Sequence, residues 1–189
     1  MSRRGNLFVI SGPSGTGKGT LLQGALAGVP DAWVSVSATT REPRPGEVDG
    51  VSYHFLSNGE FERLIREDGL LEWANVYGNL YGTPRAEVEG HIAAGEQVIL
   101  EIDVQGGLQV RDRLPESVLI FIEPPSIEEL RRRLMGRATE SSDDVSRRLE
   151  AAEGEIASAS CYDYRVVNDD LDRAVAEVLS IVDRHANSR

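Results

Sequence analysis

Short apolar runs alternate with longer amphipathic stretches along most of the chain. Several of the runs are nearly continuous in valine, isoleucine and leucine, which is typical of strands covered on both faces of a sheet. Alternation of such strands with helices predicts βαβ units, so we expect an α/β fold, a three-layer parallel sheet with helices on both faces. The expected core strands are Leu7–Ile10, Trp33–Val36, Val98–Ile102, Val118–Ile122 and Arg165–Val167. Ser126 with Glu129 forms a capping-box pair that predicts a helix near Ile127–Met135.

The interval from residue 39 to residue 81 breaks this alternation. It contains a short strand at Tyr53–Leu56, a helix opened by the capping-box pair Ser57 and Glu60, and an extended run at Leu71–Tyr77. Because the interval carries aromatic and aliphatic residues of its own, we interpret it as an inserted subdomain. The expected division is a core domain at 1–38 and 82–189 with the subdomain at 39–81.

Composition narrows the choice of partners and compartment. The 189 residues carry a formal net charge of −11, which argues against nucleic acid or an anionic membrane as a partner. No apolar stretch of the sequence approaches the length of a membrane span. The single cysteine, Cys161, excludes an internal disulfide and is typical of a reducing compartment. We therefore expect a cytoplasmic protein in which Cys161 is a small buried hydrophobe.

The only lysine of the chain lies in a glycine-rich turn between an apolar run and a helical stretch. Strand, glycine loop, lysine and helix, in that order, predict a phosphate-binding loop, because glycines let backbone N–H groups approach the phosphates and the ammonium reaches the terminal ones. The alternative is an ordinary glycine-rich turn. The predicted ATP-binding residues of the loop are Gly12, Pro13, Ser14, Gly15, Thr16, Gly17, Lys18, Gly19 and Thr20.

Further motifs lie at 37–47, Gly50, 53–55, Glu72, 81–83, 101–106, 136–140 and 167–169. Together with the phosphate-binding loop, these motifs resemble those of the guanylate kinase family, in the family's order and over nearly the whole sequence. The resemblance implies a phosphate-loop kinase fold, phosphoryl transfer from ATP to GMP with Mg²⁺, GMP binding by the inserted subdomain, and a lid at about residues 136–143.

Two arginines three residues apart, Arg41 and Arg44, lie beside a proline–glycine turn. Guanidinium groups hold phosphate oxygens bidentately, which a lysine cannot do. The resemblance implies that both arginines grip the GMP phosphate and that Tyr53 and Tyr81 add hydroxyl donors. The alternative is a solvated loop in which the arginines pair with its own glutamates.

Glu72 and Asp103 would explain recognition of guanine. The N1–H and 2-amino groups of guanine are donors that carboxylates accept, and O6 needs a donor such as the hydroxyl of Thr83 or Ser37. Adenine would leave the carboxylates unpaired. Glu72 could instead be a surface acid opposite arginines of the preceding helix. Asp103 could instead hold Mg²⁺ through water, as could Glu101, and it is also suited to cap the next helix.

Gly19 stands where the phosphate-loop pattern has a magnesium-binding Ser or Thr. Mg²⁺ would then be held mostly by nucleotide oxygens and water, and Thr20 could reach the α-phosphate. The resemblance further implies that Arg137 and Arg148 neutralise the transferring phosphoryl group and that Asn168 contacts adenine, with a turn role as its alternative. Arg133 is left open between an adenine contact and a solvated helix face.

Two other functions are compatible with parts of the pattern. One is a non-enzymatic, guanylate-kinase-like protein-binding module, against which the presence of Lys18 argues. The other is a kinase of another phosphorylated ribose compound, against which Ser37, Glu72 and Thr83 argue. ATP and GMP are the expected partners, and the sequence leaves open whether the protein is a monomer or a homo-oligomer.

Overall fold

The structure, a computed structural model, describes residues 4–135 and 142–187. Its main sheet has five strands, and each neighbouring pair is parallel. The order is β2 (Ala32–Val34), β7 (Gln97–Glu101), β1 (Leu7–Ser11), β8 (Val118–Glu123) and β9 (Tyr164–Val167). All five predicted core strands are confirmed, although β2 begins one residue earlier than predicted and ends two residues before Val36.

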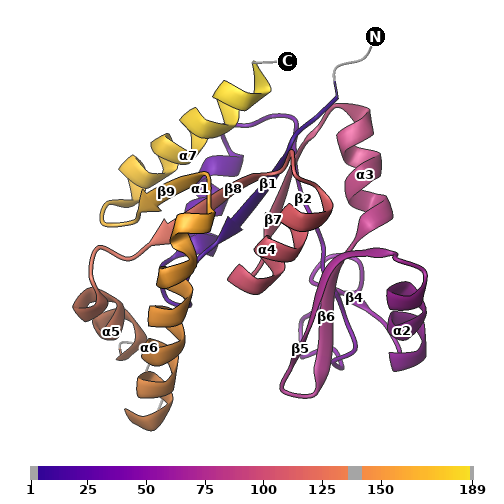
Figure 1. Cartoon of the computed structure of the whole chain (residues 1–189), viewed down its shortest axis with the longest axis horizontal. Coiled ribbons are helices and arrows are strands. Elements are labelled where there is room, and N and C mark those ends of the chain that lie inside the picture. The colour runs from indigo at the N-terminus through magenta and orange to yellow at the C-terminus, as the bar shows by residue number, and fades with distance from the viewer. Residues whose placement is uncertain (1–3, 136–141, 188–189) are drawn as a thin grey trace.

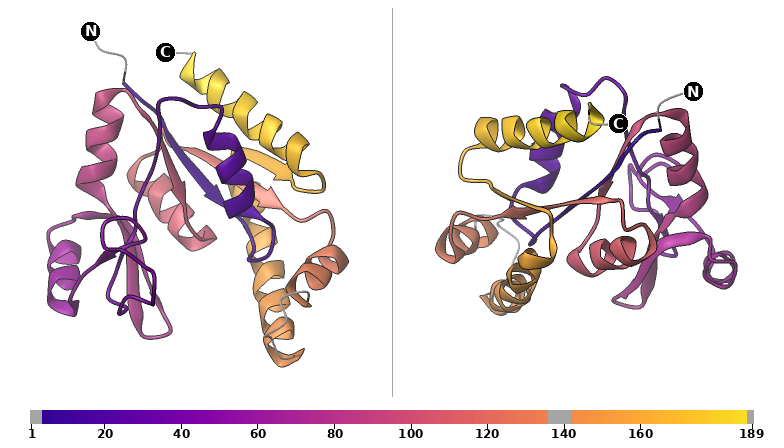
Figure 2. Two further views of the ribbon diagram at one scale, coloured as in Figure 1. Left: turned by 180° about the vertical axis from the view of Figure 1, so that it is seen from behind. Right: turned by 45° about the horizontal axis from the view of Figure 1, so that its top comes forward.

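Helices cover both faces of this sheet, as the continuous apolar strands predicted (Figures 1 and 2). Alternate residues of β1 point to opposite faces. Phe8 and Ile10 pack with α1 (Lys18–Leu26) and α7 (Leu171–Ala186) in one core. Leu7 and Val9 belong to a second core, to which α3 (Arg85–Ala94) and α4 (Val104–Arg113) contribute. The expected three-layer α/β architecture is therefore present.

The chain between β2 and α3 forms a second sheet of mixed direction. Its order is β4 (His54–Phe55), β3 (Ala38–Thr39), β6 (Asn79–Pro84) and β5 (Leu70–Val76). With α2 (Asn58–Arg66) it builds a separate small core. This part lies to one side of α4 in Figure 1, whereas α5 (Ile127–Met135) and α6 (Ser142–Ala157) lie to the other. The second sheet uses residues 38–84, and the exact subdomain limits of 39–81 stay a prediction.

Two predicted capping boxes have different outcomes. Ser57 and Glu60 form the complete box at the start of α2, with each backbone N–H bonded to the other's side chain. At α5 the Ser126 hydroxyl accepts from the Glu129 N–H at 3.1 Å, but the Glu129 carboxylate accepts hydrogen bonds from Arg132 and Arg133 instead. Charged donors on the same helix therefore take the second half of that box.

The prediction for Cys161 is wrong. The cysteine is exposed and ends the short 3-10 helix η1 (Ser158–Cys161), whereas Ala159 of the same turn is buried. A single turn can bury only part of its residues, and nothing in the sequence indicated which.

We expect Gly107→Ala to destabilise the protein by about 1–3 kcal/mol. A Cβ at this position of α4 would lie 2.4 Å from the Oη atom of Tyr162, a buried ring held edge-on against Phe121. The matched control is Gly90→Ala on α3, where the new methyl group would meet no atom within 4 Å. Because alanine has a higher helix propensity than glycine, Gly90→Ala should stabilise the protein by about 0.5–1 kcal/mol. Urea unfolding that gave both variants the same sign would contradict this packing argument.

Candidate active site

The predicted phosphate loop joins β1 to the first turn of α1. Gly12, Gly15 and Gly17 all have positive φ angles, so the loop follows a backbone path that residues with a Cβ rarely adopt. At Gly17 a Cβ would also lie 2.8 Å from Asn168 Nδ2. The first N–H groups of α1 have no partner within the helix, and the positive end of its dipole lies at the loop. The loop therefore has the geometry of an anion site.

Lys18, the first residue of α1, folds back over this loop. Its Nζ donates to the carbonyl oxygens of Gly12 at 2.5 Å and Pro13 at 3.0 Å. Burial lowers the pKa of the Lys18 ammonium, and the negative charges of Glu101, Glu155 and Asp103 oppose that effect. Neutral carbonyls thus hold the ammonium at the loop, where the charges of three acids act on it.

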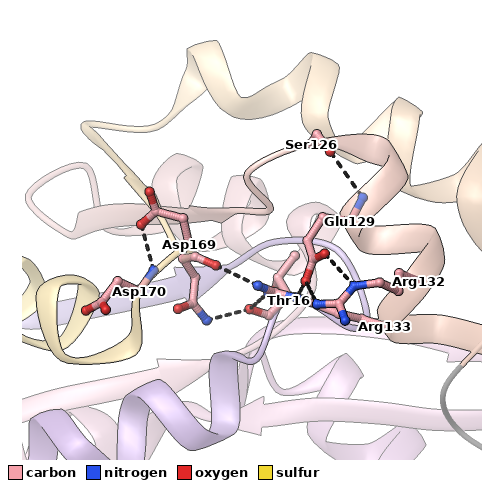
Figure 3. Close-up of polar contacts among 8 residues, drawn as sticks. Thr16, Ser126, Glu129, Arg132, Arg133, Asp169 and Asp170 are labelled. Carbon is pink, nitrogen blue, oxygen red and sulfur yellow. Dashed lines mark hydrogen bonds and ion pairs between the residues drawn. The ribbon is translucent and has the colours of Figure 1, made fainter.

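Two side chains from distant parts of the chain meet the loop backbone at Thr16 (Figure 3). Asn168, which follows β9 and is only 6% exposed, donates from Nδ2 to the Thr16 carbonyl at 2.7 Å. Arg133 of α5 donates to the Asn168 carbonyl at 3.0 Å and reaches the Thr16 carbonyl at 3.5 Å. Arg133 therefore belongs with Asn168 at this end of the loop, whereas Arg132 is exposed and pairs with Glu129.

A pocket of about 230 Å³ lies between the two sheets. Five residues predicted to bind the acceptor nucleotide line it, from elements far apart in the sequence: Ser37, Tyr53, Glu72, Tyr81 and Asp103. Glu101 and Ile102, at the carboxyl end of β7, complete the wall nearest the main sheet. This is the edge at which ligands collect in open parallel sheets.

Glu72 is a buried carboxyl group in this pocket, 6% exposed. The alternative of a surface acid is therefore wrong. Burial raises the pKa of Glu72 to about 7, and the hydrogen bond from Thr83, 2.7 Å from Thr83 Oγ1 to Glu72 Oε1, opposes the rise. Thr83 is itself fully buried and uses its proton on Glu72. Of the two hydroxyls predicted to read O6, Ser37 is the one that lines the pocket.

Arg41 lies over the rings of Tyr53, which lines the pocket, and Phe55. Its Nη2 donates to both carboxylate oxygens of Glu47, at 2.9 and 3.0 Å, and this pairing lowers the pKa of Glu47. The backbone N–H of Arg44 donates to the same carboxylate at 2.7 Å, and the Arg44 side chain is exposed. The Arg41–Glu47 pair of the solvated-loop alternative is thus present, but it lies beside the pocket.

Asp103 is the N-cap of α4, as one of its alternatives proposed, and its Oδ1 accepts from the Gly106 N–H at 2.7 Å. Glu101 lies nearby, and a Cβ at Gly19 would be 3.9 Å from both of its carboxylate oxygens. These hard oxygen donors suit Mg²⁺. Within residues 4–135 and 142–187, however, no group of three or more potential ligands could hold a metal ion without other donors.

Arg148 of α6 reaches the phosphate loop, where its Nη2 contacts the Ser14 hydroxyl. Arg137, and most of the predicted lid at 136–143, lie outside the described residues.

Comparison with known proteins decides the family. The sequence model described as guanylate kinase matches residues 4–185. The chain belongs to the guanylate kinase family. A curated guanylate kinase from Rubrobacter xylanophilus is 57% identical over 96% of this chain and 95% of its own length. One from Thermus thermophilus is 54% identical over 95% of this chain and 81% of its own. The crystal structure of guanylate kinase from Anaplasma phagocytophilum superposes with a TM-score of 0.76, at 35% identity, over 99% of this chain and 89% of that one.

Three residues near the site of this guanylate kinase family member have no site role predicted from the sequence. Glu155 on α6 faces Lys18 and has its own pKa raised by burial. Gln109 on α4 bonds to the backbone of β5. Glu47 was considered only as a partner of solvated arginines. Acids and amides are common on exposed helices and loops, so no local signal separates these three from their neighbours.

None of the helices that the structure describes is long and apolar enough to cross a membrane.

Proposed function

We propose that this chain transfers the γ-phosphoryl group of ATP to GMP and yields ADP and GDP. One observation carries the proposal: the same pocket is lined by the buried Glu72 and by Tyr53, over whose ring Arg41 lies. Glu101 and Asp103, whose charges act on Lys18, line this pocket as well. An acceptor nucleotide lying in this pocket would have its base at Glu72 and its phosphate at Arg41. The high identity to guanylate kinases supports the choice of GMP. Among the described residues, no observation favours either alternative function.

At the base end, Glu72 and Asp103 would accept hydrogen bonds from the N1–H and 2-amino groups of guanine. The Thr83 hydroxyl already donates to Glu72, so we assign Ser37, which lines the pocket, as the hydrogen-bond donor to O6. Adenine has no N1–H and presents an amino group where Ser37 donates, and unpaired buried polar groups make such a mismatch costly.

At the phosphate end, Arg41 and Arg44 would hold the GMP phosphate, with Tyr53 and Tyr81 as hydroxyl donors. Arg41 is 14% exposed and is held by Glu47 and by aromatic rings, so little side-chain freedom remains to be lost when the phosphate arrives. A phosphate can displace or share the Glu47 pairing because guanidinium has five donors in a planar fork.

Transfer needs alignment more than covalent help from the protein. A GMP phosphate oxygen attacks the γ-phosphorus, the bond to the β–γ bridging oxygen breaks, and ADP leaves with that electron pair. The attacking oxygen is already anionic at neutral pH, so no strong general base is required. Lys18, the loop N–H groups, Arg148 and, by the family resemblance, Arg137 would neutralise the charge that the two polyanions bring together. We assign ATP to the loop Gly12–Thr20 and to Asn168.

Magnesium fits this site as a companion of the nucleotide rather than as a resident metal. Asp103 would hold it through water, with Glu101 as a second candidate, and nucleotide oxygens would supply the remaining ligands. When bound, it would neutralise the phosphates and orient them. We place this activity in the cytoplasm, in keeping with the single free cysteine.

A coupled assay of ADP formation with GMP, dGMP, AMP and UMP as acceptors, each with and without Mg²⁺, tests the proposal. We expect turnover with GMP in the presence of Mg²⁺ and little or none with AMP or UMP. Absence of turnover with all four would favour the binding module, and equal turnover of all four would refute the assignment of the base pocket.

Arg41→Lys should raise the KM for GMP by about 10–30-fold, because a lysine cannot form the bidentate, charge-assisted contact. The KM for ATP should change by less than about twofold, since Arg41 lies at the acceptor end of the site. Steady-state kinetics with each substrate varied in turn measures both. The matched control is Arg132→Lys, an arginine that is 78% exposed on α5 and pairs with Glu129. Equal effects of the two substitutions on GMP would contradict the role of Arg41.

A further inference from the structure

Strand β5, which carries Glu72, is at the edge of its sheet. Its inner neighbour is β6, and in the described part of the chain no strand pairs with its other side. The outward backbone groups of an edge strand need partners when they are taken from water. Helix α4 of the core domain supplies them.

Gln109 of α4 bonds to both backbone groups of one β5 residue. The Trp73 N–H donates to Gln109 Oε1 at 3.2 Å, and Gln109 Nε2 donates to the Trp73 carbonyl at 3.1 Å. The side-chain amide thus takes the place of a neighbouring strand's peptide group. This two-point contact fixes both the position of Trp73 and the rotation of its backbone, and Trp73 directly follows Glu72.

The same face of α4 contacts β5 one turn before and one turn after Gln109. Gly106, one turn before Gln109, lies so close to Glu72 that a Cβ there would be 2.8 Å from Glu72 Oε2. Arg113, one turn after Gln109, donates to the Leu70 carbonyl at 2.7 Å. Residues three and four apart share a helix face, so Gly106, Gln109 and Arg113 present one face of α4 to residues 70–73 of β5.

We propose that Gln109 is a positioning residue that fixes Glu72 relative to Asp103, so that the two carboxylates meet the guanine edge together. This inference rests on the proposed role of Glu72. Asp103 is the N-cap of α4 and Gln109 lies on the same helix, so the amide ties the second carboxylate to the element that already holds the first. Sites built in this way lose performance when a supporting contact lets a group shift by about 1 Å.

The test is Gln109→Leu, which keeps the volume and removes both hydrogen-bonding groups. We expect the KM for GMP to rise about tenfold, the preference for GMP over AMP in kcat/KM to fall by a similar factor, and the KM for ATP and the kcat at saturating GMP to change less than about twofold. If this variant fails to fold, Gln109→Asn retains the polarity but draws the amide back from the strand, and the same changes are expected.

Arg113→Ala is the matched control, because Arg113 fastens the same strand at Leu70, away from the base. It should lower the melting temperature without changing the preference for GMP over AMP. If Gln109→Leu alters the KM for GMP and the preference no more than Arg113→Ala, the positioning role is refuted. Glu72→Gln distinguishes a failure of the Gln109 inference from a failure of the proposed base pocket. A raised KM for GMP in Glu72→Gln with no effect of Gln109→Leu overturns this inference alone, whereas no effect of Glu72→Gln overturns the assignment of the base pocket as well.

Discussion

Lys18→Met should reduce kcat by about 10²–10³-fold while the protein folds normally. Methionine keeps the length of the side chain and removes the ammonium that would meet the charge growing on the transferring group. Lys18 is the only lysine of the sequence, so no second lysine can take over its role. Its hydrogen bonds in the structure go to two loop carbonyls, so the substitution breaks no hydrogen bond to a carboxylate. Single-turnover measurements at saturating ATP and GMP separate this loss from weaker binding.

The exposed cation Arg66 on α2 provides the control, since Arg66→Met removes one positive charge from a surface pair that is 67% and 61% exposed and should leave kcat unchanged. The single lysine also permits a chemical test without mutation. Acylation of the side-chain amine should abolish turnover, and bound ATP should protect against it. Full activity after acylation of Lys18, located by mass spectrometry, would contradict its role.

The sequence predicted the elements of the fold well because the periodicity of burial is local. The five core strands are apolar throughout since both faces of the main sheet are covered, and residues such as Phe8 and Val9 pack into different cores. Errors occurred where several neighbours compete for one group, or where the packing of a turn decides which of its residues is buried. Glu129 turned to Arg132 and Arg133 rather than completing its capping box, and Cys161 is exposed on a turn whose buried side the sequence does not indicate.

In the candidate site, too, some features could be predicted from the sequence and others depend on contacts between distant residues. Motif spacing placed Lys18 in its loop, and the resemblance to the guanylate kinase family pointed to the five predicted residues that line the pocket. Spacing could not show that the Thr83 proton is used on Glu72, because β5 and β6 must pair in a particular register before these side chains meet. Nor could it single out Gln109, whose partner is a backbone group 36 residues away.

Glu72→Gln should raise the KM for GMP on the order of 10²–10³-fold and leave the KM for ATP nearly unchanged. The amide would set an N–H donor against the donor edge of guanine. Thr83 could still donate to the amide oxygen, so the change would be confined to the side that faces the pocket. Steady-state kinetics with each nucleotide varied separately measures the two constants.

The pH dependence of GMP affinity should carry the signature of Glu72. Its pKa is raised to about 7 by burial, and only the ionised form accepts both donors of guanine. Affinity of the unmodified protein should therefore weaken as pH falls through 7. The GMP phosphate also changes charge near pH 6. Dividing the dissociation constant of GMP for Glu72→Gln by that for the unmodified protein removes this shared contribution. The resulting ratio should shrink as the pH is lowered.

The same substitution should stabilise the fold at high pH. The folded-state pKa of Glu72 lies above its ordinary value of 4.5, so the carboxyl favours the folded state most below pH 4.5 and loses that contribution as pH rises through 7. The difference between 4.5 and about 7 corresponds to about 3 kcal/mol. Glu72→Gln cannot ionise, so its advantage in free energy of unfolding should grow across this window and level off above it. Glu62→Gln, a change at an acid that is 61% exposed, should show no such dependence. A constant difference between Glu72→Gln and the unmodified protein from pH 5 to pH 9 would mean that Glu72 is not held neutral by burial, and the affinity ratio would then lose its explanation.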